Sequence, residues 1–229
     1  MADLNEKGTE KTRKTYVRHG LPADRVLGVL VADLKVVAKP LKGEQALACE
    51  LYKTGIVEAM YLAGMVANGA KMSGELLQSW AEEAHGLPLI AEFPVPWVTV
   101  ENPEARALAV KWMSEKKPAS SGWCAYSGLL ATQPDAKLDL AEIEALLNRV
   151  PAEINAAPNR VRANMNSFVI STGAYVTPLL KQAKAVARKL GTVAVDVGDT
   201  DCKISVALAA IEKIEKAGKQ GVKKKTIRC

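Results

Sequence analysis

The chain has 229 residues, of which 48% are hydrophobic and 24% are charged, values that are typical of a globular protein. Its formal net charge is +6, and this excess lies between Lys213 and Cys229, where seven basic residues accompany one acidic residue. That distribution excludes a uniformly basic surface and favours a local anionic partner, because clustered lysines attract phosphate groups without reading a base sequence.

The N-terminus and the cysteines indicate the cellular setting. The charged segment from Met1 to Arg18 lacks the apolar core of a signal peptide, and no apolar run approaches the length of a membrane span. Four scattered cysteines without a CxxC pair predict reduced thiols, and two histidines without ligand spacing predict no metal site. We therefore expect a cytoplasmic protein without a membrane partner.

In the first half of the chain, apolar residues at helical spacing are interrupted by prolines and glycines. Pro22 suits a first helical turn, Ser73 suits an N-cap, and Gly55 separates two helices of one pair. The segment 93–100 contains two prolines and predicts an extended connector. The predicted helices cover residues 22–39, 43–54, 56–68, 73–84, 102–115 and 120–132.

The second half continues the same pattern. Asp139 is a predicted N-cap, and Gly191 and Gly218 are predicted helix ends. The segment 192–197 has some strand character, but we favour an extended loop. The predicted helices cover residues 139–150, 159–175, 178–190 and 201–217, and a basic tail follows them.

About ten helices joined by short turns predict an all-α fold. Their size and spacing favour antiparallel helix pairs stacked into an α-solenoid with a long concave face, and a compact helical bundle is the alternative. The predicted organisation is a charged N-terminal extension over residues 1–15, one helical domain over residues 16–217 and a flexible basic tail over residues 218–229.

The charges in the body of the chain are also unevenly distributed. Residues 71–112 have a net charge of −3, whereas residues 149–190 have a net charge of +6. A surface that tracks phosphates is one interpretation, and a solvated helix face with a solubilising tail is the other. The candidate DNA-backbone contacts are Arg160, Arg162, Lys181, Lys184, Arg188, Lys223, Lys224, Lys225 and Arg228.

Two further groups of residues are chemical candidates. Trp80 and Trp123 lie on predicted helices, where they either belong to the core or line an aromatic groove that stacks on a base. Glu82, Glu83 and His85 follow Trp80 closely and are candidates for acid–base catalysis, with an exposed helix end as the alternative.

Three stretches of the chain resemble the DNA alkylation repair family, the AlkD-like group. They read ARALAVKWMSEKKPASSGWCAYSGLLATQ, NRVRANMNSFVISTGAYV and DTDCKISVALAAIEKIEKAGKQGVKKKTIRC. The resemblance implies a right-handed solenoid of HEAT-like repeats whose concave face holds duplex DNA. It also implies excision of 3-methyladenine and 7-methylguanine without base flipping, no metal or nucleotide cofactor, and a nucleoid-associated bacterial protein.

The family's catalytic residues carry over poorly. Family glycosylases have a helix of the type SWW-x-x-VD, whereas this chain reads SWAEEAH, so that His85 stands at the position of the aspartate. The family's arginine falls near Tyr126, which we add to the aromatic groove. A histidine cannot supply the negative charge that stabilises a developing sugar cation.

Three hypotheses therefore remain open at this point. The first is a DNA-binding protein for damaged or branched DNA with little or no glycosylase activity. The second is a working N-glycosylase that uses Glu82 or Glu83 with Trp80 and Trp123. The third is a helical scaffold that binds proteins. In each case we expect a monomer.

Overall fold

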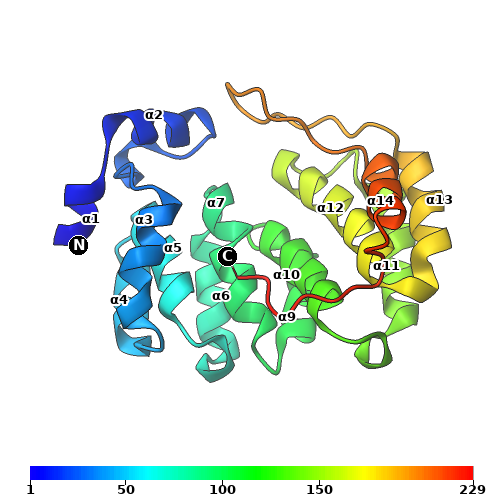
Figure 1. Ribbon diagram of the computed structural model, residues 1–229, viewed down its shortest axis with the longest axis horizontal. Coiled ribbons are helices and arrows are strands. Elements are labelled where there is room, and N and C mark those ends of the chain that lie inside the picture. Colours follow the sequence, from blue (N-terminus) through cyan, green and yellow to red (C-terminus); the bar gives the residue numbers. More distant parts are fainter. Residues whose placement is uncertain (229) are drawn as a thin grey trace. The chain divides into compact units, whose positions relative to one another are not determined.

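A computed structural model describes residues 1–228, and these residues form fourteen α-helices and five short 3₁₀ helices without any β-strand (Figure 1). The predicted all-α class is confirmed. The described residues pack into two compact units. Unit 1 contains Met1–Ala125, Val197–Asp201 and Arg228, and unit 2 contains Tyr126–Asp196 and Cys202–Ile227. Cys229, the fourth predicted thiol, lies outside the described residues.

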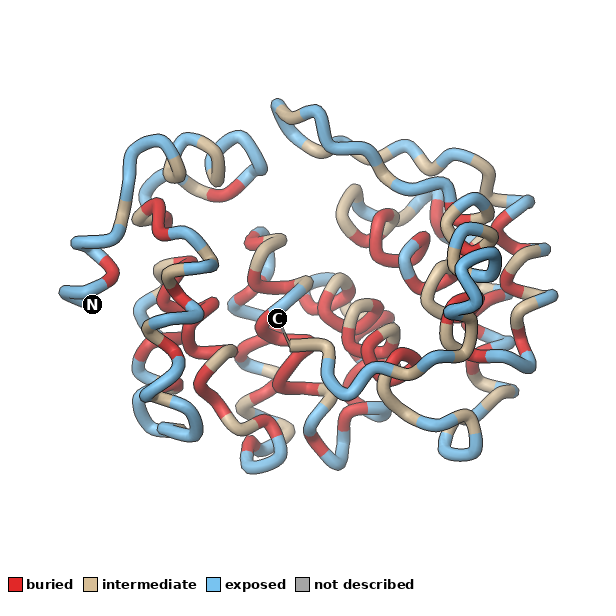
Figure 2. The backbone as a smooth tube through the Cα atoms, viewed as in Figure 1, coloured by how far each residue is buried: buried red, intermediate tan, exposed pale blue. Residues whose placement is uncertain are grey.

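Unit 1 is built around α5 (Val57–Val66), which contacts α3, α4, α7 and α8. Nine of its ten residues are buried, as expected for a helix that is apolar on all sides (Figure 2). Its other helices are α1 (Ala2–Lys7), α2 (Glu10–Arg18), α3 (Val31–Ala38), α4 (Gln45–Lys53), α6 (Gly74–Glu83), α7 (Pro88–Ala91), α8 (Pro94–Val100) and α9 (Ala105–Trp112). The helix α10 (Ala119–Thr132) begins in unit 1 and ends in unit 2.

A buried carboxylate explains why the helix predicted from Pro22 begins only at Val31. Glu58 is fully buried on α5, and its side chain accepts hydrogen bonds from the backbone N–H groups of Leu27, Gly28 and Val29 at 2.6–3.2 Å. These bonds hold the segment in an extended form, because its N–H groups point to Glu58 instead of to a preceding helical turn.

The connector predicted over residues 93–100 is wrong, since Pro94–Val100 is a buried helix. Both prolines lie in the first turn, where the backbone N–H has no helical partner and the fixed φ angle of proline suits a helix. Gly64 of α5 allows this helix to approach closely, because a Cβ atom there would lie 2.4 Å from the Cβ of Pro94.

Unit 2 is built around α12 (Asn159–Tyr175), which contacts α11 (Leu140–Glu153), α13 (Leu180–Leu190) and α14 (Ala207–Lys216). The predicted N-cap at Asp139 is confirmed by a 3.1 Å bond from the Glu142 N–H. The predicted extended loop at residues 192–197 is also confirmed, but it continues to residue 206, so the last helix begins later than predicted.

Candidate nucleic-acid interface

The helix α13 in unit 2 presents a basic stripe. Its small residues Ala183 and Ala187 are buried, whereas Lys181, Arg188 and Lys189 are exposed. Arg188 and Lys189 lie in its last turn, where positive charge interacts favourably with the helix dipole. The predicted phosphate contacts Lys181, Lys184 and Arg188 share this stripe at spacings of three and four residues, and Lys181 and Arg188 are exposed.

One member of the predicted stripe has a structural role instead. The Nζ atom of Lys184 lies 2.8 Å from Oε2 of Glu215 on α14, and the side chain is only 20% exposed. Because this ammonium already has a carboxylate partner, the prediction that Lys184 contacts phosphate is not supported. The ion pair joins α13 to α14.

The first turn of α12 carries the two predicted arginines, both partly buried. Arg162 donates from Nη1 to the carbonyl of Ala194 at 3.1 Å, while its Nε atom is buried without a hydrogen-bond partner among the described residues. Beside them, Asn159 donates to and accepts from the backbone of Asp196 at 2.6 and 2.8 Å. These hydrogen bonds hold residues 194–196 of the extended loop to α12. They also leave a guanidinium with an unused donor.

A pocket of about 300 Å³ lies in unit 2. Arg162 and Lys189 both line it, so that two positive charges meet at one concave site of unit 2. Its other lining residues are Pro151, Ile154, Asn155, Leu190, Thr192, Val193 and Ala194. The positive charge of these two side chains would attract an anion such as a phosphate to the pocket.

The tail is not the free arm that the sequence predicts, because two of its cations bind elsewhere in the chain. In unit 2, Lys223 donates to the carbonyl of Leu130 at 2.9 Å and pairs with Asp135 at 2.8 Å. In unit 1, Arg228 pairs with Glu101. Both cations bind carbonyls near helix ends, which have no intrahelical donor. These two residues are therefore corrected from phosphate contacts to structural ones.

The two lysines between them remain accessible. Lys224 and Lys225 are exposed, and the Nζ atom of Lys224 lies 5.7 Å from the centre of the Tyr175 ring in a cation–π contact. The backbone N–H of Lys224 donates to the Ala131 carbonyl at 2.8 Å. The backbone of the tail is thus held in place while these two side chains face solvent.

The predicted aromatic groove is wrong, because all three of its rings belong to the core. Trp80 and Trp123 are 2% and 1% exposed, and Tyr126 is 3% exposed. Trp80 stacks on Tyr52 with ring centres 3.9 Å apart, and the hydroxyl of Tyr126 donates to Glu142 at 2.6 Å. Large rings on helices gain most free energy when they are buried, so none of them offers a face to a base.

The predicted acid–base residues lie near the C-terminal end of α6, and all three are exposed. Glu83 accepts from the Ser79 hydroxyl at 2.8 Å, and Nδ1 of His85 lies 3.2 Å from the Lys117 carbonyl. Glu82 and Glu83 therefore face solvent, where a high dielectric weakens the stabilisation of a sugar cation.

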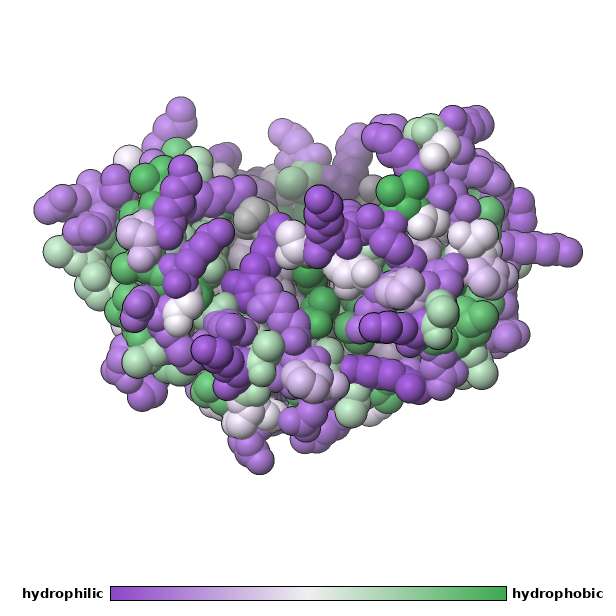
Figure 3. Space-filling view, turned by 60° about the horizontal axis from the view of Figure 1, so that its bottom comes forward, coloured by the Kyte–Doolittle hydropathy of each residue, from purple (hydrophilic) through white to green (hydrophobic). Residues whose placement is uncertain are grey.

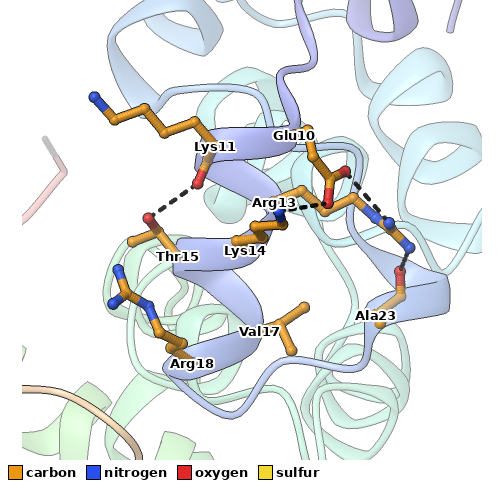
Figure 4. A pocket seen from close by; sticks show the side chains of 8 residues that line it. All are labelled: Glu10, Lys11, Arg13, Lys14, Thr15, Val17, Arg18 and Ala23. Atoms are coloured by element: carbon orange, nitrogen blue, oxygen red, sulfur yellow. Dashed lines mark hydrogen bonds and ion pairs between the residues drawn. The ribbon is translucent and has the colours of Figure 1, made fainter.

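Sequence reasoning missed a basic helix, α2, that begins in the predicted N-terminal extension (residues 1–15) and continues into the predicted helical domain. The nine residues of α2 include Lys11, Arg13, Lys14 and Arg18 but only one acid, Glu10. They line an open hollow of about 650 Å³ together with Thr15, Val17 and Ala23 (Figure 4). The excess of basic residues in α2 was the available signal, but it is cancelled when the charges of all residues before Lys213 are summed.

The structure also bears on metal binding and on membrane insertion. Residues 1–228 contain no cluster of three or more histidine, cysteine or acidic side chains that would suit a metal ion. None of the helices in the described part of the chain combines the length and the apolar character that a membrane crossing requires.

Comparisons with known proteins agree with this architecture. The family model of the DNA alkylation repair enzymes matches residues 1–188. Two uncharacterized proteins, Lin0241 of Listeria innocua and Lmo0209 of Listeria monocytogenes, are 30% and 28% identical over 216 residues, which are 92% of this chain and 93% of each relative.

A solved structure is also similar, with a TM-score of 0.89 and 32% identity, over 100% of this chain and 97% of that one. That protein is described as one of a new family related to the HEAT-like repeat DNA glycosylases, with affinity for branched DNA structures. The HEAT-like fold inferred from the sequence is thereby confirmed, and the chain belongs to the DNA alkylation repair family.

Proposed function

We propose that this protein binds DNA through the phosphate backbone and prefers branched DNA to linear duplex. The observation that carries the proposal is the pocket of unit 2 that Arg162 on α12 and Lys189 on α13 both line. Lys181 and Arg188 extend the positive charge along the same helix, as a backbone-tracking surface requires.

The lack of an aromatic ring in the lining of this pocket supports recognition of the backbone instead of stacking on a base. Its lining offers two cations, an asparagine and a threonine but no aromatic ring. Phosphate contacts position a protein on DNA without specifying sequence. The preference for branched DNA is supported by the affinity ascribed to the similar solved protein, at 32% identity over the whole chain.

The protein-binding alternative finds less support on the face in Figure 3. There the apolar side chains lie in small separate groups between hydrophilic ones. Protein-docking surfaces are usually marked by a larger contiguous apolar patch. We therefore favour DNA as the partner.

Binding to a labelled four-way junction and to a linear duplex of equal length, between about 50 and 200 mM salt, tests the proposal. The wild type should bind the junction more tightly at every salt concentration. The triple variant Lys181→Ala, Arg188→Ala, Lys189→Ala should lower the slope of log K against log salt by about 2.7, since each phosphate contact contributes about 0.9.

The matched control is the triple variant of three exposed lysines in unit 1, Lys35→Ala, Lys39→Ala and Lys42→Ala, which removes the same net charge. An equal loss of slope in this control would assign the effect to net charge alone. A wild-type slope near zero would refute DNA binding and leave the protein-binding scaffold. Equal affinity for both DNAs would refute the preference for branches.

A further inference from the structure

A second cationic surface lies on α2 in unit 1. This helix has no buried residue, so its packing does not explain its composition (Figure 2). Lys11 and Arg18 are both exposed, and neither forms an ion pair within residues 1–228. They are seven residues apart, two helical turns, and Figure 4 shows both side chains projecting to the same side of the helix.

The other two cations of α2 shape the hollow. Arg13 lies 3.6 Å from Glu10 and donates to the carbonyls of Ala23 and Val26 at 2.6 and 3.3 Å. Lys14 lies 4.0 Å from the same carboxylate. Glu10 thus partners these two cations only. The loop that follows α2 is fixed by Arg13, and Lys11 and Arg18 keep their full charge for a ligand.

The hollow has an apolar part beside its charges. Val17 is 39% exposed, and it points into the hollow opposite Ala23 (Figure 4). In Figure 4, Val17 projects to the opposite side of α2 from Lys11 and Arg18, so these two cations define the ligand. A ligand that suits them has repeated negative charges, as the sugar–phosphate backbone of a nucleic acid has. The rise between the two cations, about 10.5 Å, equals the axial rise of about three base pairs of duplex DNA.

We infer that α2 is a second DNA-backbone contact of this chain, in addition to the one on α13. This inference rests on the proposed function. Two contacts on one chain reinforce each other, because binding at the first contact raises the local concentration of the DNA at the second.

The double variant Lys11→Ala, Arg18→Ala tests this inference, with Lys35→Ala, Lys39→Ala as the charge-matched control. For the four-way junction we expect the salt slope to fall by about 1.8. Over a fourfold increase in salt, the variant should therefore lose about twelvefold less affinity than the wild type loses. For the linear duplex the slope should fall in the same direction, because a phosphate contact is independent of the DNA structure that carries it. The control should change neither slope.

Each other outcome has a definite meaning. An unchanged junction slope would overturn the contact at α2. If the wild type binds DNA but only the α13 triple variant changes the slope, this inference fails while the proposed function stands. The charge-retaining variant Lys11→Arg, Arg18→Lys should keep the wild-type slope, which separates loss of charge from loss of fold.

Discussion

Replacing Arg228 should destabilise unit 1 instead of weakening DNA binding. Its guanidinium donates to the carbonyls of Gly64 and Ala67 at 2.8 Å each, and to that of Met65 at 3.3 Å. These carbonyls lie at the C-terminal end of α5, where no helical N–H remains to bind them. Two further bonds, at 2.6 and 2.5 Å, go to Glu101.

The magnitude follows from these contacts. The Arg228 side chain is 19% exposed and its carboxylate partner is 37% exposed. A hydrogen bond to a charged group contributes about 1.5–3 kcal/mol, but the bonds of one guanidinium are not additive, and water would reach the vacated carbonyls. We therefore expect Arg228→Met, which keeps the apolar stem, to lower the free energy of unfolding by about 2–4 kcal/mol.

Urea unfolding followed by tryptophan fluorescence is the suitable assay, because all four tryptophans of the chain lie in unit 1. Lys225→Met in the same tail is the control, and its effect should stay within about 0.5 kcal/mol because the side chain is exposed. In a cycle with Glu101→Gln, the coupling to Arg228→Met should be about 1–2 kcal/mol. An Arg228→Met variant as stable as the Lys225→Met control would refute the reasoning.

Two other predictions concern pH and catalysis. Burial, and after it the charge of Glu58, raises the pKa of the Tyr16 hydroxyl from 10.0 to about 12. Since the folded state favours the neutral hydroxyl, its stabilisation is present below about pH 10 and is lost as the pH rises to about 12. The stability difference between wild type and Tyr16→Phe in urea should shrink over this window, and a constant difference would contradict the assignment. When excess protein is incubated with DNA that contains 7-methylguanine, no abasic sites should form above the level of a protein-free control, because Glu82 and Glu83 face solvent. Formation of abasic sites that is abolished by Glu82→Gln or Glu83→Gln would instead establish a glycosylase.

The sequence alone determined most of the helical framework, because the signals that begin and end helices are local. Ser73 caps α6 through its hydroxyl, and Asp139 caps α11, as their positions predict. Gly55, with a φ angle of +69°, separates α4 from α5 as expected. The segment 93–100 misled the prediction, because proline in a first helical turn and proline in a connector look the same in sequence.

The tertiary structure decided which charged and aromatic residues remain available to a partner. Lys184 and Arg188 share a helix, yet only Lys184 meets a carboxylate, on α14. Lys223 binds a helix end, whereas its neighbour Lys224 faces solvent. Such differences depend on which element packs opposite each side chain, and residues far apart in the sequence supply that element. The tail and the tryptophans were therefore misassigned, and the basic hollow of α2 was found only from the fold.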